Sequence, residues 1–362
     1  MSGRAGPLVG LRMVEFAGIG PAPMCGMLMS DLGADVVRID RPGTEYDRFT
    51  VESRGRRSVV LDLKTPGGQR DALRLIGAAD ALIEGFRPGV MERLGLGPEP
   101  VLAANPRLVY GRMTGWGQSG PYAQAAGHDI NYVALTGALH ALGPKDKPAV
   151  PLNLIGDFGG GALYLAFGVL AAVLHARQTG EGQVVDCAMS DGTISLMGLL
   201  YGHFARGDWL DQRESNIIDG GSHFYNVYQC ADGRWISLAS IEPQFYGRLL
   251  AAAGSEDEDF ADQHDQARWP RLKEKMAAII AGRTSDEWRQ IMEGADLCYA
   301  PVLSIAEAPT HPHNRAREAF VEIDGVIQPG PAPKFSRTPG KVQHGPVAAG
   351  AHNGAVFEDW GV

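Results

Sequence analysis

Short apolar runs alternate with amphipathic segments along the first half of the chain. The apolar runs predict buried strands, at residues 11–16, 35–40, 58–61, 81–84 and 108–113. The segments between them predict helices, at residues 24–32, 67–79 and 88–94. A strand followed by a helix and another strand is typical of parallel pairing. This half therefore predicts an α/β domain, Rossmann-like, with helices covering a mostly parallel sheet.

The second half of the chain has a different pattern. Residues 159–177 form a long apolar segment that predicts a buried helix, and residues 184–189 predict one more strand. Two alternating segments between residues 226 and 240 flank Ala231-Asp232-Gly233, a turn signal that predicts a β-hairpin. Helical patterns follow, at residues 243–253, 269–281 and 285–292. These elements predict a smaller α+β unit.

The length of 362 residues also favours two domains, because a single hydrophobic core stops growing well below that size. We expect a large domain over residues 1–200, completed by the C-terminal segment 330–362, and a small domain over residues 222–310. Residues 201–221 and 311–329 are the predicted linkers.

Charge and cysteine usage narrow the classes of partner. The formal net charge of −9 argues against a nucleic-acid or anionic-membrane partner. An anionic ligand would need a local basic cluster, for which Arg54, Arg56 and Arg57 are one candidate. No stretch approaches the ~18 apolar residues of a membrane span. Four widely spaced cysteines without a CxxC pair favour neither a metal site nor disulfides, and a reducing cytoplasm fits best.

A glycine-rich loop follows the first predicted strand. Gly18, Gly20 and Pro23 occupy the positions of a dinucleotide-binding motif, and Asp40 ends the second strand where a ribose-binding acid would lie. Pro21, however, removes an amide that a pyrophosphate would use. We therefore expect a tight turn at a crevice of the sheet and no nicotinamide site.

Basic residues cluster after the predicted strands, at the edge where open α/β sheets bind ligands. They are Arg38, Lys64 within Leu61-Asp62-Leu63-Lys64, Arg87 and Arg93. As a set they are candidates to hold phosphates, because guanidinium and ammonium groups both pair with them. Taken singly, each is also compatible with an ordinary solvated surface charge.

Two titratable residues beside glycines are the candidate catalytic groups. His128 lies in a Gly-His-Asp segment between two predicted extended stretches, and Asp157 precedes Phe158 and three glycines. A histidine of ordinary pKa near 6.5 suits proton transfer, but a structural histidine is the alternative. Asp157 is also a good N-cap for the following helix. Its backbone amide would then stabilise an enolate oxygen, and burial would have to raise a carboxyl pKa that the helix end lowers.

Glu242 follows a predicted strand of the small domain. It either caps the next helix or, if the domains meet, orients His128 and raises its basicity. The sequence contains no GxSxG, HExxH, P-loop or EF-hand motif, so hydrolase and kinase functions have no support.

Several motifs together resemble family III CoA-transferases over nearly the whole chain, as far as Arg337-Thr338-Pro339-Gly340. They are Val14-Glu15-Phe16, Asp31-Leu32-Gly33-Ala34-Asp35-Val36-Val37-Arg38, Leu61-Asp62-Leu63-Lys64, Phe86-Arg87-Pro88-Gly89-Val90 and Thr114-Gly115-Trp116-Gly117. Within that family, Gly127-His128-Asp129 and Gly156-Asp157-Phe158-Gly159 are similar to the racemases that act on 2-methylacyl-CoA thioesters.

The resemblance implies that His128 and Asp157 are the two catalytic bases and that Glu242 contacts the histidine. It also implies an interlocked homodimer, and no cofactor or metal, because CoA is part of the substrate. It places the CoA along twelve positions: Arg38, Leu61, Asp62, Leu63, Lys64, Arg87, Arg93, Gly127, Asp129, Ile130, Asn131 and Tyr132.

Two other functions stay open from the sequence. The first is a CoA-transferase in which Asp129 is the nucleophile, a function that His128 argues against because transferases of the family resemble Gly-Tyr/Phe-Asp at this segment. The second is an acyl-CoA-binding protein with an inactive site. Among acyl chains, a branched fatty acid, a sterol side chain and an aryl-propionyl group all remain possible.

Overall fold

The computed structural model describes residues 3–362, which form two compact units. The first contains the chain up to residue 136 together with residues 152–196 and 309–362, and the second contains residues 137–151 and 197–308. The segments predicted as linkers carry structure of their own. Helix α9 (Gly198–Arg206) belongs to the second unit, and α13 (Pro312–Ala316) and the hairpin of β10 (Phe320–Ile323) and β11 (Val326–Pro329) belong to the first.

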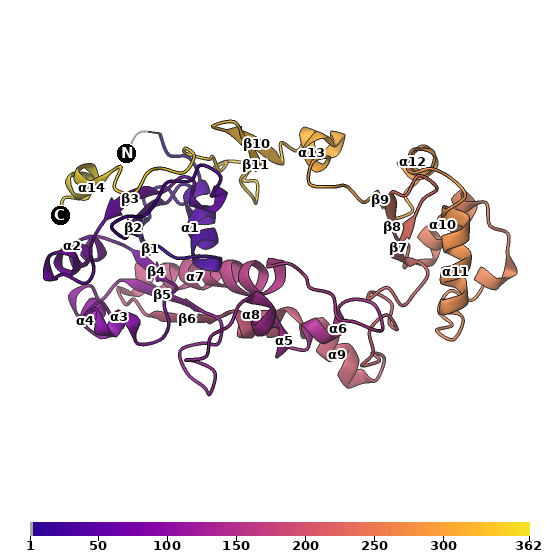
Figure 1. The fold of residues 1–362 in the computed structure, drawn as a ribbon, viewed down its shortest axis with the longest axis horizontal. Helices are drawn as coiled ribbons and strands as arrows, with labels where there is room; N and C mark the ends of the chain where they lie inside the picture. The colour runs from indigo at the N-terminus through magenta and orange to yellow at the C-terminus, as the bar shows by residue number, and fades with distance from the viewer. Residues whose placement is uncertain (1–2) are drawn as a thin grey trace. The chain divides into compact units, whose positions relative to one another are not determined.

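A six-stranded sheet forms the centre of the first unit (Figure 1), in the order β3-β2-β1-β4-β5-β6. Its strands are β1 (Arg12–Phe16), β2 (Asp35–Asp40), β3 (Arg57–Val60), β4 (Ala81–Glu84), β5 (Val109–Thr114) and β6 (Val184–Ala188). Every neighbouring pair is parallel, which confirms the predicted α/β class. The strand order reverses between β1 and β4, and ligands of open α/β sheets bind at that point.

Helices cover both faces of this sheet because its strands are apolar on both sides. Met13 of β1 packs with the first face and the next residue, Val14, with the second. Helices α1 (Pro21–Asp31) and α7 (Leu163–Thr179) supply the apolar side chains over the first face. The second face is covered by α2 (Pro66–Gly77), α3 (Val90–Arg93), α4 (Pro98–Ala104) and the C-terminal α14 (Asn353–Trp360).

The helix predicted over residues 159–177 begins earlier and in a different form. A π-helix, η2 (Leu154–Ala162), precedes α7, and in it the Phe158 amide donates to the Asn153 carbonyl at 3.3 Å. Its glycines allow close approach to α8 (Met189–Leu196), since a Cβ on Gly160 would lie 2.6 Å from the Thr193 nitrogen. The glycine run therefore serves helix packing.

Leu154–Thr179 is also one helical stretch long and apolar enough to cross a membrane, with 39% of its most apolar window buried. The buried face of α7 lies against β5 and β6, as the core helix of a globular protein does. The expectation that no stretch approaches the length of a membrane span is corrected by this helix, whose length and composition also fit the core helix of a globular protein.

The arginines proposed as a local anion site are internal ion pairs. Arg54 is 1% exposed and pairs with Asp31, and Arg56 is fully buried against Glu15. Arg57 pairs with Asp35. The prediction of an anion site at these arginines is wrong, because their charges are already neutralised inside the fold.

The second unit is α+β, with a three-stranded antiparallel sheet of β7 (Tyr225–Gln229), β8 (Trp235–Ala239) and β9 (Tyr299–Pro301). The predicted hairpin is therefore confirmed. Helices α10 (Pro243–Ala253), α11 (Trp269–Ile280) and α12 (Ser285–Met292) pack their apolar faces onto the core of this unit. The short α6 (Ala138–Ala141) also belongs to it.

Candidate active site

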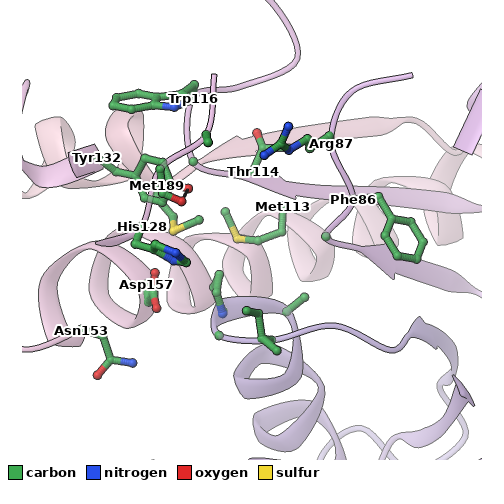
Figure 2. Close-up of a pocket in the computed structure, with 18 of the residues that line it drawn as sticks. Phe86, Arg87, Met113, Thr114, Trp116, His128, Tyr132, Asn153, Asp157 and Met189 are labelled. Atoms are coloured by element: carbon green, nitrogen blue, oxygen red, sulfur yellow. Dashed lines mark hydrogen bonds between the residues drawn. The ribbon is translucent and has the colours of Figure 1, made fainter. Parts of the chain in front are cut away.

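A cavity of about 490 Å³ opens at the carboxyl ends of the strands, where the order reverses between β1 and β4. Its walls come from the segment after β1, Ile19–Ala22, the segment after β4, Gly85–Pro88, and the end of β5, Met113–Trp116. His128 and Asp157 line the same cavity. The switch point thus brings together the two residues that the sequence singled out (Figure 2).

His128 is the N-cap of helix α5 (Asp129–Ala134) and is not placed between extended stretches as predicted. Its backbone amide donates to the Asn131 side-chain oxygen at 3.1 Å, which fixes the start of the helix. Its imidazole is exposed and lies beside Asp157 at the cavity wall (Figure 2). An exposed ring at a cavity edge is free to exchange protons with a bound molecule.

Asp157 is the fourth residue of η2 and not its N-cap. Its carboxylate is half-buried and faces Gly20, where a Cβ would lie 3.2 Å from Asp157 Oδ2. Gly20 has a φ of 74°, a left-handed conformation that glycine adopts without strain. The glycine-rich loop after β1 therefore makes room for this carboxylate at the crevice of the sheet.

The environment of Asp157 favours its protonated form. Burial raises the pKa of the Asp157 carboxyl above its ordinary value, and the nearby Asp129 charge raises it further. A hydrogen bond from the Asn153 side chain and the charge of His128 oppose this shift. The expectation that burial must raise the pKa of this carboxyl is confirmed in direction.

Asp129 lies behind the cavity wall. It is 8% exposed, and its Oδ1 accepts a hydrogen bond of 2.7 Å from the Asp157 backbone amide. Two expectations are corrected by this contact. Asp129 does not line the cavity, so an acyl group there meets Asp157 first. The Asp157 amide, proposed as a donor to an enolate oxygen, already has the Asp129 carboxylate as its acceptor.

Aromatic side chains form one wall of the cavity. The Tyr132 hydroxyl donates to the Gly127 carbonyl, and its ring meets Trp116 edge-to-face at 4.8 Å between ring centres. Cβ atoms on Gly115 and Gly127 would lie 2.0 Å and 2.7 Å from this ring. Both positions therefore require glycine for Tyr132 to pack there. Burial and the Asp157 charge raise the pKa of Tyr132, and the Arg87 charge opposes this shift.

Of the twelve positions predicted to hold CoA, three line the cavity and nine do not. Arg87, Gly127 and Tyr132 line the cavity. Arg38 is buried and pairs with Asp40, so its guanidinium is not a free phosphate ligand. The other eight do not line the cavity: Leu61, Asp62, Leu63, Lys64, Arg93, Asp129, Ile130 and Asn131. Of these, Leu61 and Leu63 pack against the core under α2.

The cavity also contains residues that sequence reasoning missed. Met113, Phe158 and Met189 supply apolar surface next to His128 and Asp157, and Glu52 adds a second carboxylate. Met113 is the last residue but one of β5 and Met189 follows β6, so both lie at the ligand-binding edge of the sheet. The sequence signal was the position of these two methionines at the ends of predicted strands, the same edge of the sheet that identified Arg87.

Glu242 belongs to the second unit, where it is the exposed N-cap residue of α10. Its carboxylate makes no capping hydrogen bond to the helix. The capping function considered for this side chain is therefore not observed, and its contact with His128 stays a prediction.

Comparison with known proteins identifies the family. The model of CoA-transferase family III matches residues 8–353. The chain belongs to this family. It is 44% identical over 359 residues to the alpha-methylacyl-CoA racemase of Mus musculus and 42% identical over 358 residues to that of Homo sapiens; each match covers 98% of the chain and 93% of the relative.

More distant relatives carry transferase names. The succinyl-CoA–D-citramalate CoA-transferase of Chloroflexus aurantiacus is 30% identical over 380 residues, which cover 98% of the chain and 94% of the relative. Among solved structures, a CaiB/BaiF family protein from Brucella suis superposes with a TM-score of 0.84 at 25% identity, covering 99% of the chain and all of that structure. The fold of the family therefore extends over the whole chain.

Proposed function

We propose that this chain interconverts the (R)- and (S)-forms of 2-methylacyl-CoA thioesters by 1,1-proton transfer. The observation that carries the proposal is the presence of His128 and Asp157, from separate segments, on the wall of one cavity at the switch point of the sheet. The high identity to two named racemases supports the same reaction class.

The reaction needs two proton carriers on opposite sides of one carbon. The thioester carbonyl acidifies the α-C–H bond, one base removes that proton, and an enolate forms. The other residue, in its protonated form, then delivers a proton to the opposite face. Neutral His128 and protonated Asp157 are the required starting pair for one stereoisomer, and the reverse pair serves the other. The raised pKa of Asp157 supports its use as an acid.

CoA enters the proposal as part of the substrate, and no separate cofactor or metal is invoked. Arg87 is the cavity residue whose charge suits a CoA phosphate, and Tyr132 with Trp116 offers aromatic surface beside it. Met113, Phe158 and Met189 offer apolar surface for the acyl chain. Comparing the kinetics of branched, sterol-derived and aryl-propionyl thioesters would identify the acyl class.

The direct test is hydrogen exchange at the α-carbon. Each pure enantiomer of a 2-methylacyl-CoA is incubated with the protein in D₂O, and deuterium content and chirality are followed by mass spectrometry and chiral chromatography. We expect both enantiomers to gain one α-deuterium and to approach the same racemic mixture. Exchange of the α-hydrogen without inversion of configuration would rule out the racemase function. The absence of both exchange and inversion would also rule it out.

Acyl transfer is distinguished by a covalent intermediate. A CoA-transferase would form an acyl anhydride that hydroxylamine converts to a hydroxamate, and the cavity geometry points to Asp157 as the residue modified, because Asp129 is buried behind it. We expect no hydroxamate on either residue after incubation with 2-methylacyl-CoA.

A homodimer is the second part of the proposal. Helix α7 exposes large apolar side chains on one face, with Leu163 at 54%, Phe167 at 72% and Leu174 at 61% exposure. Their spacing of four and seven residues places them on one stripe, and Ile194 of α8 is also exposed. Contiguous exposed apolar surface of this kind marks protein–protein contacts. A second copy of the chain is the occupant we propose.

The dimer and the role of Glu242 are tested together. Phe167→Glu places a charge in the proposed interface and is expected to shift the protein from dimer to monomer in sedimentation velocity. Glu181→Gln, a substitution at an exposed position after α7, should not shift it.

Mixed dimers of His128→Ala and Glu242→Gln chains regain one intact site only if Glu242 acts from the partner chain. No recovered exchange would place both groups in the same chain, and full exchange in Glu242→Gln homodimers would remove Glu242 from the reaction.

A further inference from the structure

Asp129 has no part in the two-base reaction as proposed, yet it is tightly tied to Asp157. The Asp157 backbone amide donates to Asp129 Oδ1 at 2.7 Å. The two residues come from different elements, Asp129 from the first turn of α5 and Asp157 from η2. This contact therefore joins the segment that carries His128 to the segment that carries Asp157.

The backbone around this contact is built to accept the carboxylate. A Cβ on Gly156 would lie 2.5 Å from Asp129 Oδ1 and 3.0 Å from its Cγ. Gly156 is buried and its φ is not in the left-handed region, so its lack of a side chain is needed for space and not for conformation. The glycine before Asp157 is thus explained by the close approach of Asp129.

The second oxygen of Asp129 carries the further clue. Asp129 Oδ2 is buried and has no hydrogen-bond partner among residues 3–362. A buried charged oxygen without a partner costs more free energy than a buried neutral group, and an asparagine would accept the Asp157 amide without the charge. The hydrogen bond to Asp157 therefore does not explain why residue 129 is charged.

We propose that Asp129 is a positioning residue for Asp157: it anchors the backbone that presents the Asp157 carboxyl to the cavity, and its negative charge favours the protonated form of that carboxyl. This inference rests on the proposed racemase function, because only a reaction that needs Asp157 as an acid has a use for the charge. A negative charge placed near a carboxyl disfavours the ionisation of that carboxyl. Asp129 acts through Asp157 and does not touch the substrate.

Other charged groups around Asp157 act differently. The titratable or charged residues on the elements that face it are Glu52, Arg87, His128, Tyr132 and Asp191. Among them only His128 has a resolved influence on Asp157, and it lowers the pKa of that carboxyl. Asp129 is thus the acidic neighbour that raises the pKa of Asp157.

Two substitutions separate the anchor from the charge. Asp129→Asn keeps an oxygen that accepts the Asp157 amide but removes the charge, and Asp129→Ala removes both. Gly156→Ala pushes on the same contact from the other side and serves if the alanine variant does not fold. Asp191→Asn is the matched control, because Asp191 is an exposed aspartate on α8, which packs against η2.

The first readout is the titration of Asp157, followed by carbon-13 NMR of side-chain-labelled aspartate and assigned with Asp157→Asn. We expect Asp157 to titrate at lower pH in Asp129→Asn than in the native protein, and Asp191→Asn to leave the titration unchanged. An unchanged titration in Asp129→Asn, or an equal shift in Asp191→Asn, would overturn the proposal. This readout decides the matter even if the native protein shows no α-proton exchange, the result that would overturn the racemase function instead.

The second readout is α-proton exchange from each enantiomer as a function of pH. We expect the limb that reports Asp157 to move to lower pH in Asp129→Asn, with kcat reduced and KM little changed. Asp129→Ala should lose about ten- to a hundredfold in kcat, the factor that corresponds to a lost hydrogen bond to a charged group. A uniform loss at all pH values in both variants, without a shift, would assign Asp129 a merely structural role.

Discussion

Two histidines in the two units have opposite environments. His128 caps a short helix at a cavity and is exposed, whereas His223 is fully buried in the core of the second unit. His223 contacts the rings of Phe224, Tyr246 and Phe260. The same residue type is thus placed for proton exchange in one unit and for packing in the other, and the surroundings alone make the difference.

The hydrogen bonds of His223 define its tautomer. The Tyr246 hydroxyl donates its proton to the Phe260 carbonyl at 3.0 Å, so His223 Nε2 must donate to the Tyr246 oxygen, 2.7 Å away. The other ring nitrogen, Nδ1, is buried without a partner among the described residues. Burial lowers the pKa of His223 to about 4, because protonation would place an unpaired charge in an apolar core.

The largest contrast is expected in catalysis. His128→Ala and Asp157→Asn should each reduce α-proton exchange by roughly 10²–10⁴-fold, the usual loss for a missing general acid or base. His128 is exposed, so its removal should change the free energy of unfolding by no more than about 0.5 kcal/mol. Deuterium incorporation and urea denaturation measure the two effects. Undiminished exchange in His128→Ala would remove this histidine from the reaction.

The core histidine should show the reverse pattern. His223→Ala leaves a cavity among three rings and removes the hydrogen bond to the Tyr246 oxygen, so we expect a loss of about 3 kcal/mol in the free energy of unfolding. Chemical denaturation followed by tryptophan fluorescence reports this loss, since Trp269 and Trp288 lie in the same core. A destabilisation as small as that of His128→Ala would contradict the distinction.

A smaller effect is expected from pH. The pKa of His223 in the folded state, about 4, lies below the value near 6.5 of an unfolded histidine. The folded state therefore binds fewer protons, and the contribution of His223 to stability is complete above pH 6.5 and is lost as the pH falls toward 4. His223→Phe cannot titrate and should flatten this part of the stability profile, measured by thermal unfolding at successive pH values. Identical profiles would show that other groups cause the acid sensitivity.

The alternation of short apolar runs with amphipathic segments was sufficient to predict the parallel sheet, because strands buried on both faces have continuous apolar runs. The hairpin and helices α10 and α12 were predicted at nearly their observed bounds for the same local reason. Helices α5 and α8 were not predicted, since their short, partly polar sequences show no clear helical pattern and both helices pack against η2. Local propensity is weak when tertiary contacts decide.

The chain by itself determined that His128 and Asp157 are the proton carriers to consider, because an imidazole and a carboxyl are recognisable from composition and neighbouring glycines. Only the tertiary structure decided which carboxylate faces the cavity and which lies behind it. Asp129 and Asp157 are 28 residues apart, and their hydrogen bond exists only because α5 packs on η2. It also decided that Arg38, Arg54 and Arg56 are internal partners, since ion pairing depends on distance in space.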